Sequence, residues 1–288
     1  MDSISIKAYG KINLGLDVLR RREDGYHEVK MIMQTVNIYD TLQMKKIKED
    51  KIKLGVNVPN LEADESNLVY KAIKLIKDTN GVTGGVEAYL EKNIPIAAGM
   101  AGGSADCAAA LKGMNELYEL GLSVDELCVL GKKLGADVPF CVVGGTMLAE
   151  GIGEILTPLN PVQGDYLVIA KPSIDVPTKF VYENLNVNDG HRIHPNVDAQ
   201  LEAIKEGNND LMYENMGNIL ESVTIGKYSV IEDIKKELVQ LGAKAAMMSG
   251  SGPTVFAIFN DEESAIVAKK SIDGKYELDT LEVTTYKN

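Results

Sequence analysis

A chain of 288 residues with 45% hydrophobic and 25% charged residues has the composition of a folded globular protein, and its length allows one large domain or two ordinary ones. No stretch approaches the roughly 20 consecutive apolar residues of a membrane-spanning helix, and the opening residues MDSISIKAYGK lack a signal peptide's apolar run, so we expect a cytoplasmic protein without membrane contact. The net charge of -12 argues against nucleic acid as the main partner. Three scattered cysteines, Cys107, Cys128 and Cys141, indicate neither a disulfide framework nor a zinc site.

The first third of the chain shows the alternation typical of strands. In INLGLDV, residues 12–18, apolar side chains alternate with polar ones or glycine, which puts the apolar set on one face of a sheet. Further strands are predicted at 28–37, 41–48 and 85–91.

Three helices are predicted between residues 66 and 135. Ser66 is the predicted N-cap of an amphipathic helix that ends near Gly81. An alanine-rich helix follows over about 104–120. Ser123 and Glu126 have the spacing of a capping box at the start of the third helix.

Proline and glycine concentrate near residue 158, which predicts a boundary between domains at 1–158 and 159–288. Beyond it, the pattern predicts a strand in YLVIAKP, several helices between 178 and 240, and a strand in TVFAIF. The irregular alternation of helices and strands favours an α+β protein with two lobes.

The segment NIPIAAGMAGGSADCAAAL is the most informative part of the chain. Glycines let a backbone approach a phosphate closely, and the first amides of the helix that follows have no intrahelical acceptor. Together they predict an anion-binding loop, although tight packing of a helix of small residues against a sheet would explain the same glycines and alanines. GxxxxGK[ST] does not occur, so the loop is not of the Walker type. The predicted loop consists of Pro95, Ile96, Ala97, Ala98, Gly99, Met100, Ala101, Gly102, Gly103 and Ser104.

Three further features indicate a phosphoryl-transfer site only when they are taken together. MMSGSGPTVFA, residues 247–257, is a second glycine-rich turn, which could close on the other side of a triphosphate. Lys11 and Asp137 are a cation and a carboxylate in distinctive settings, and phosphoryl transfer needs both to align a hydroxyl and take its proton. Taken singly, each of these charged residues is more often a solvated surface group.

The motifs AYGKINLGLDV, PIAAGMAGGSADCAAAL, LGADVPF and MMSGSGPTVFA occur in the order that is typical of the GHMP kinase superfamily, which the chain resembles from about residue 7 to residue 260. GKINLGLDVLRRREDGYHEV and EGIGEILTP more closely resemble the kinases that phosphorylate 4-diphosphocytidyl-2-C-methyl-D-erythritol. One departure stands out, since Ala97, Ala98 and Ala101 occupy positions where the superfamily often has glycine, and Ala105 one where it often has serine. Ser104 is therefore the one hydroxyl left in this stretch for phosphate or metal.

The resemblance implies a two-domain GHMP kinase fold, with an N-terminal domain like domain 2 of ribosomal protein S5 and a ferredoxin-like C-terminal domain. It also implies that residues 95–104 wrap the phosphates of ATP and that Mg²⁺ accompanies the nucleotide. Asp137 matches the superfamily's catalytic aspartate and Lys11 the lysine beside it. The implied reaction is phosphorylation of the substrate's 2-hydroxyl in the non-mevalonate (MEP) pathway of isoprenoid biosynthesis.

The same resemblance implies a substrate site. Tyr26 and His27 match the residues that stack on and hydrogen-bond to cytosine, and Tyr182 matches an aromatic residue on the base's other face. Asn13 matches a residue near the methylerythritol hydroxyls. His191 and His194 in HRIH could suggest a metal site, but two loop histidines without a cysteine cluster are more often exposed and inert.

Two other functions stay open on the sequence. A kinase of the same superfamily could act on mevalonate, a mevalonate phosphate, homoserine or a sugar, and DGYHEV is the segment that argues for the cytidine substrate. A nonenzymatic RNA-binding protein could share the S5-like domain, but the negative charge disfavours it. A small molecule is thus the expected partner, and the expected oligomeric state is a monomer or a homodimer.

Overall fold

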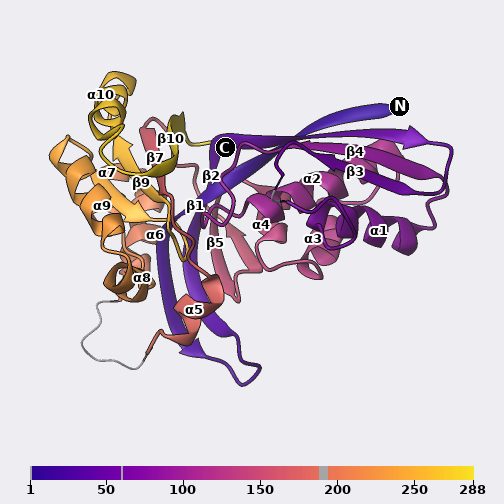
Figure 1. Cartoon of the computed structure of the whole chain (residues 1–288). Helices are drawn as coiled ribbons and strands as arrows, with labels where there is room; N and C mark the ends of the chain where they lie inside the picture. Colours follow the sequence, from indigo (N-terminus) through magenta and orange to yellow (C-terminus); the bar gives the residue numbers. More distant parts are fainter. Residues whose placement is uncertain (1, 60, 188–193) are drawn as a thin grey trace. The chain divides into compact units, whose positions relative to one another are not determined.

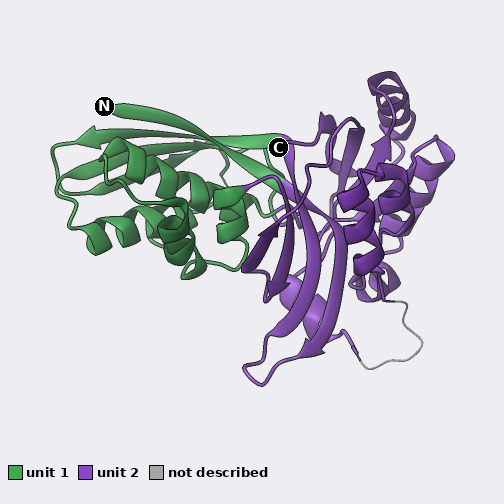
Figure 2. Ribbon diagram, turned by 180° about the vertical axis from the view of Figure 1, so that it is seen from behind, with its two compact units in different colours: residues 1–10, 38–96, 101–143 green, residues 11–37, 97–100, 144–288 purple. Residues whose placement is uncertain are grey.

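The computed structural model describes residues 2–59, 61–187 and 194–288 (Figure 1). The chain forms two compact units, which Figure 2 colours separately. Two long strands, β1 (Ser3–Arg21) and β2 (His27–Ile47), contribute a segment to each unit. Unit 1 comprises residues 1–10, 38–96 and 101–143, and unit 2 comprises residues 11–37, 97–100 and 144–288. The two compact units are each made of several separate segments, whereas the predicted domains are the continuous ranges 1–158 and 159–288. The units therefore do not test the boundary near residue 158, which stays a prediction.

Unit 1 is a sheet segment covered by helices on one face (Figure 2). The last part of β2 pairs antiparallel with β4 (Gly85–Glu91), which pairs parallel with β3 (Ile52–Val56). A Cβ on Gly113 would lie 2.5 Å from Met44 Sδ, so this glycine lets a helix lie close to the strand. The helices of unit 1 are α1 (Leu68–Asn80), α2 (Gly102–Leu117), α3 (Val124–Lys132) and α4 (Val138–Val143).

The helix starts in unit 1 follow local capping chemistry. α1 begins one residue later than predicted, since the side chain of Asn67, not Ser66, accepts a hydrogen bond from the Val69 amide at 2.9 Å. The Ser66 hydroxyl donates instead to Asp64, which makes the predicted N-cap wrong by one position. The capping box of Ser123 and Glu126 is confirmed at the start of α3.

The strand predictions were right in type and incomplete in number. The segments 28–37 and 41–48 belong to one strand, β2, and the predicted strand at 85–91 is β4. The alanine-rich helix, α2, begins two residues before its predicted start and ends three residues before its predicted end. The strands that were not predicted are β3, β5 (Thr146–Gly151), β6 (Ile155–Pro158), β8 (Ala245–Met248) and β10 (Leu278–Thr285).

Unit 2 contains two sets of strands. The first part of β2 pairs with β5, and β5 pairs with β6. A four-stranded antiparallel sheet has the order β10-β7-β9-β8, with α9 and α10 packed against it. The strands of this sheet are β7 (Tyr166–Pro172), β8 (Ala245–Met248), β9 (Val255–Phe259) and β10 (Leu278–Thr285). The helices of unit 2 are α5 (Thr178–Glu183), α6 (Val197–Glu206), α7 (Asn209–Glu214), α8 (Glu221–Lys227), α9 (Val230–Gln240) and α10 (Glu262–Ile272).

Both units combine helices with sheet, as the α+β prediction requires. Across the described part of the chain, every helix is too short or too polar to span a lipid bilayer.

Candidate active site

The predicted phosphate loop, residues 95–104, connects β4 to α2 and has an unusual backbone. Ala97, Gly99 and Ala101 all have positive φ angles, of 52°, 72° and 56°. Glycine adopts such angles freely, whereas an L-residue with a Cβ pays roughly 1–2 kcal/mol for each. Two of the alanines that replace the superfamily's glycines therefore sit in strained conformations.

The N-terminus of α2 leaves donors available to a ligand. Its N-cap, Ala101, makes no side-chain capping bond. The amides of Gly102, Gly103 and Ser104 precede the first intrahelical acceptor, and they lie at the positive end of a 16-residue helix. This arrangement suits an anion such as phosphate.

Lys11 is tied to the phosphate loop within unit 2. The Lys11 ammonium donates to Asn13 Oδ1 at 2.7 Å and to the Gly99 carbonyl at 2.9 Å, and its backbone amide donates to the Met100 carbonyl at 3.0 Å. The lysine is 4% exposed and Asn13 is 1% exposed. The structure therefore brings together two predicted site residues, Lys11 and Asn13, and the central part of the loop.

The second glycine loop, which we define as residues 248–252, meets the phosphate loop at the same carbonyl. Ser249 Oγ donates to the Gly99 carbonyl at 3.0 Å. A Cβ on Gly99 would lie 2.1 Å from the Ser249 carbonyl oxygen, so no larger residue fits there. The two glycine-rich segments that the sequence singled out are therefore in direct contact.

Asp137 lies in unit 1, directly before α4. It is half-buried, and its carbonyl accepts a hydrogen bond from the Cys141 amide at 3.1 Å. Lys11 belongs to unit 2, so the pairing of the two side chains stays a prediction.

The predicted cytosine-binding residues lie in unit 2. The rings of His27 and Tyr182 are 5.2 Å apart and tilted by 41°, so residues 155 positions apart are in contact. Tyr26, next to His27 in the turn between β1 and β2, is 60% exposed, which leaves its ring available for stacking. Burial, with the positive charge of Arg21 adding to it, lowers the pKa of His27 below its ordinary value, so the imidazole is neutral at pH 7 and can exchange hydrogen bonds with a base.

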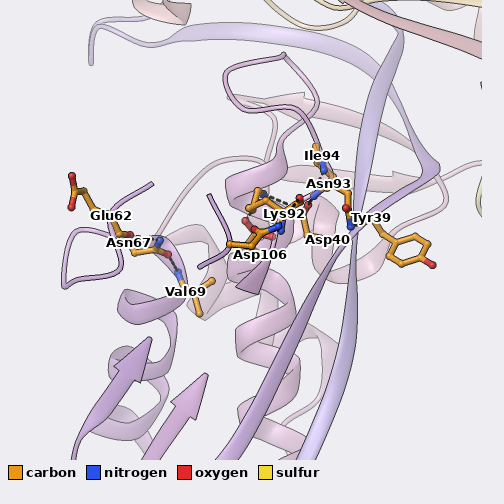
Figure 3. A network of polar contacts seen from close by, with 10 residues as sticks. Tyr39, Asp40, Glu62, Asn67, Val69, Lys92, Asn93, Ile94 and Asp106 are labelled. Carbon is orange, nitrogen blue, oxygen red and sulfur yellow. Dashed lines mark hydrogen bonds and ion pairs between the residues drawn. The ribbon is translucent and has the colours of Figure 1, made fainter. Parts of the chain in front are cut away.

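Sequence reasoning missed a buried charge cluster beside the phosphate loop, which Figure 3 shows. The Lys92 ammonium contacts the carboxylate of Asp40 on β2 and lies 2.7 Å from that of Asp106 on α2. A Cβ on Gly102 would lie 3.3 Å from this ammonium, which places the cluster against the first turn of α2. Asp40 also accepts bonds from the amides of Asn93 and Ile94, just before the loop begins.

The cluster has two carboxylates for one ammonium. Burial, with the nearby charge of Asp40 adding to it, raises the pKa of Asp106 to about 8, although the Lys92 ammonium acts in the opposite direction. One oxygen of this carboxylate, Oδ1, is buried and has no hydrogen-bond partner among the residues that the structure describes. An aspartate inside an alanine-rich helix was the sequence signal that could have revealed the cluster.

The described residues hold no group of three or more His, Cys, Asp and Glu side chains that could bind a metal. A Mg²⁺ ion that arrives on ATP needs few protein ligands, so its binding stays a prediction. His191 lies outside the described residues. His194 is exposed, as expected, and its Nδ1 lies 2.8 Å from Asp17 Oδ1.

The family profiles cover both halves of the chain. The profile of the GHMP kinases N terminal domain matches residues 67–145, and that of the GHMP kinases C terminal domain matches residues 200–278. Among solved structures, a homoserine kinase from Cytophaga hutchinsonii is 21% identical, with a TM-score of 0.76 over 100% of this chain and 95% of that one, and so shares the fold.

Closer similarities concern one kind of GHMP kinase. A 4-diphosphocytidyl-2-C-methyl-D-erythritol kinase of Lachnospira eligens is 53% identical over 277 residues, which are 96% of each chain. A kinase of the same name from Clostridium perfringens is 45% identical over 281 residues, covering 98% of this chain and 97% of that one. The crystal structure of a 4-(cytidine 5'-diphospho)-2C-methyl-D-erythritol kinase is 30% identical, with a TM-score of 0.83 over 99% of this chain and 100% of that one. The chain has the two-domain GHMP kinase fold and belongs to the 4-diphosphocytidyl-2-C-methyl-D-erythritol kinase family.

Proposed function

We propose that this protein transfers the terminal phosphoryl group of ATP to the 2-hydroxyl of 4-diphosphocytidyl-2-C-methyl-D-erythritol, in the non-mevalonate route to isoprenoid precursors. The observation that carries the proposal is the 53% identity to a kinase of that name over 96% of both chains. The contact of the two glycine-rich loops at Gly99 supports the proposal independently. Two such loops can form an anion site lined by backbone amides, which is what the phosphates of a nucleoside triphosphate require.

At the phosphate end, the free amides of residues 102–104 hold the ATP phosphates. Asp137 accepts the proton of the 2-hydroxyl, and Lys11 orients that carboxylate and offsets the charge that develops on the transferred group. The hydrogen bond from Lys11 to Gly99 supports its role, because it couples the ammonium to the loop that holds the phosphates.

At the substrate end, Tyr26 stacks on the cytosine, His27 hydrogen-bonds to it, and Tyr182 covers its other face. The contact between the His27 and Tyr182 rings and the exposure of Tyr26 support this assignment. Asn13 faces the methylerythritol hydroxyls, next to the Lys11 ammonium that it binds.

Mg²⁺ bound to ATP supplies further charge neutralisation of the phosphates, and Ser104 is the loop residue whose hydroxyl would reach the metal or a phosphate oxygen. We further propose a cytoplasmic enzyme that is a monomer or a homodimer. The proposed domain boundary near 158 is supported by the family matches at 67–145 and 200–278, which fall on opposite sides of it.

The test is an ADP-release assay with several acceptors in parallel. Turnover with the cytidine diphosphate substrate, and none with mevalonate or homoserine, is the expected result. Turnover with mevalonate or homoserine alone would overturn the substrate and keep the kinase, whereas salt-dependent RNA binding without any ATP turnover would overturn both.

A further inference from the structure

The turn that leads into α8 and the first turns of that helix form hydrogen bonds to the second glycine loop. We propose that Asn218, Glu221 and Thr224 are positioning residues that fix the loop in the shape that receives the ATP phosphates. The inference rests on the proposed function for the identity of the ligand, and on the hydrogen bonds of unit 2 for the geometry.

Asn218 uses its whole side-chain amide to shape the loop. Its Nδ2 donates to the carbonyls of Met248 at 2.9 Å and Gly250 at 2.7 Å, and its Oδ1 accepts from the Leu220 amide at 3.0 Å. The residue is 6% exposed, so water does not replace these partners readily. One buried amide thereby sets the directions of two loop carbonyls.

Glu221 and Thr224 continue the same contact at intervals of three residues. One oxygen of Glu221 accepts from the Met248 amide at 2.8 Å, and the other lies 2.6 Å from the Lys235 ammonium. Thr224 is fully buried and donates to the Ser251 carbonyl at 3.2 Å. Met248 is therefore held at both its amide and its carbonyl, and the loop is held near both its ends.

The same turn is joined to the strand that carries Lys11. The Leu16 amide donates to the Gly217 carbonyl at 2.9 Å, and the Ile219 amide donates to the Leu16 carbonyl at 3.0 Å. These two bonds fix Asn218 beside Leu16 of β1, which lies five residues after Lys11 in the chain. The loop that Asn218 shapes is connected to Lys11 through the Gly99 carbonyl, because Ser249 and Lys11 both donate a hydrogen bond to that carbonyl.

The three residues hold the loop in a shape that leaves two of its backbone amides, those of Gly250 and Ser251, available to a ligand. Three loop amides are occupied: that of Met248 by Glu221, that of Ser249 by Thr254, and that of Gly252 by Ser249. Among the hydrogen bonds within the described ranges, the amides of Gly250 and Ser251 have no acceptor. Adjacent free amides at a left-handed turn form a concavity for an anion, and Gly250 has a φ of 56°. The Gly250 carbonyl and the Ser251 amide belong to one peptide plane, so releasing that carbonyl would let the plane turn, and releasing the Met248 carbonyl would loosen the residue that leads into the loop. Both changes would distort the concavity.

The test compares isosteric variants by steady-state kinetics and by calorimetric titration with ATP. Asn218→Asp keeps the acceptor and loses both donors, and Thr224→Val removes one donor at constant shape. We expect the KM and Kd for ATP to rise about tenfold in the first variant and about threefold in the second, as the loss of one or two hydrogen bonds implies. The KM for the cytidine substrate should stay within about twofold in both.

Matched variants separate positioning from general stability. Asn160 also donates from one side-chain amide to two backbone carbonyls of unit 2, those of Ile204 and Lys205, and Asn160→Asp should leave the ATP constants unchanged. Thr224→Ser restores the hydroxyl and should restore the wild-type Kd for ATP.

Equal changes in the constants of both substrates, or unchanged ATP constants in Thr224→Val, would overturn the inference. If Asn218→Asp does not fold, the Thr224→Val and Thr224→Ser pair decides alone. A wild-type protein that binds ATP but ignores the cytidine substrate would overturn the proposed function, while the ATP titrations would still test the positioning role.

Discussion

The ammonium of Lys11 donates to the carbonyl of Gly99 at 2.9 Å, across 88 positions of the chain. Ser249 donates to the same carbonyl, so one peptide group of the phosphate loop joins a strand residue to the second glycine loop. An ammonium held in this way is already ordered before ATP binds, and preorganised charge is the kind that lowers the barrier to phosphoryl transfer.

Replacing Lys11 by methionine removes this charge and keeps most of the side-chain volume. Because we propose that the ammonium offsets charge that develops in the transition state, we expect kcat to fall about 10²- to 10³-fold, the range seen when one such donor is lost. The ATP-dependent turnover of the purified variant measures this. A kcat within threefold of wild type would exclude an electrostatic role for Lys11.

Gly99→Ala should damage the fold, whereas Ala97→Gly in the same loop should not. A methyl group at residue 99 would meet the Ser249 carbonyl at 2.1 Å, and φ is 72° there. We expect the free energy of unfolding to fall by about 1–3 kcal/mol, the magnitude of a strained backbone position. At Ala97, glycine relieves a φ of 52° but adds freedom to the unfolded chain, so the net change should be within about 1 kcal/mol.

Urea unfolding of both variants tests the comparison. Equal stability of Gly99→Ala and wild type would mean that the two loops do not meet as described.

Tyr26→Ala should weaken binding of the cytidine substrate and spare ATP. One base stacked on an aromatic ring contributes roughly 1–3 kcal/mol, which corresponds to a rise in the substrate KM of about 5- to 150-fold. Tyr89→Ala is the control, since this tyrosine is also exposed, at 47%, but lies in unit 1. Similar losses for ATP and for the cytidine substrate in Tyr26→Ala would contradict a stacking role.

Asp106 makes the stability of the protein depend on pH in an unusual direction. Its pKa of about 8 in the folded state exceeds the ordinary value of 3.8, so the folded state retains a proton that the unfolded state releases. The stability from this group is complete below about pH 4 and is lost as the pH rises toward 8. Asparagine binds no proton, so Asp106→Asn should gain stability relative to wild type as the pH rises from about 4 to about 8.

Free energies of unfolding from urea titrations at several pH values measure that difference. A difference that is independent of pH would show that Asp106 is ionised throughout this range.

The sequence predicted the parts of the site that local chemistry determines. The alanine-rich helix after β4, the capping box at Ser123 and the glycine-rich turn before β9 depend on neighbouring residues, and the structure contains all three. The N-cap of α1 was misplaced because Ser66 and Asn67 are both good caps, and only the folded turn decides which side chain reaches the Val69 amide.

The rest depends on contacts between distant residues, which a single sequence does not encode locally. Lys92 reads as an ordinary surface lysine until the fold places Asp40, 52 positions away, against its ammonium. Asn218 likewise reads as an ordinary turn residue, although its amide shapes a loop 30 positions further on. Pairings of this kind follow from tertiary packing and not from periodicity.

The most direct test of the account is the turnover of an Asp137→Asn enzyme. Losing the group that accepts the hydroxyl's proton should lower kcat by about 10²- to 10⁴-fold, the usual contribution of a positioned base. The Kd for ATP should be unchanged, since the amides that hold the phosphates are intact. A folded variant that binds ATP and still releases ADP near the wild-type rate would contradict the central claim that Asp137 drives the transfer.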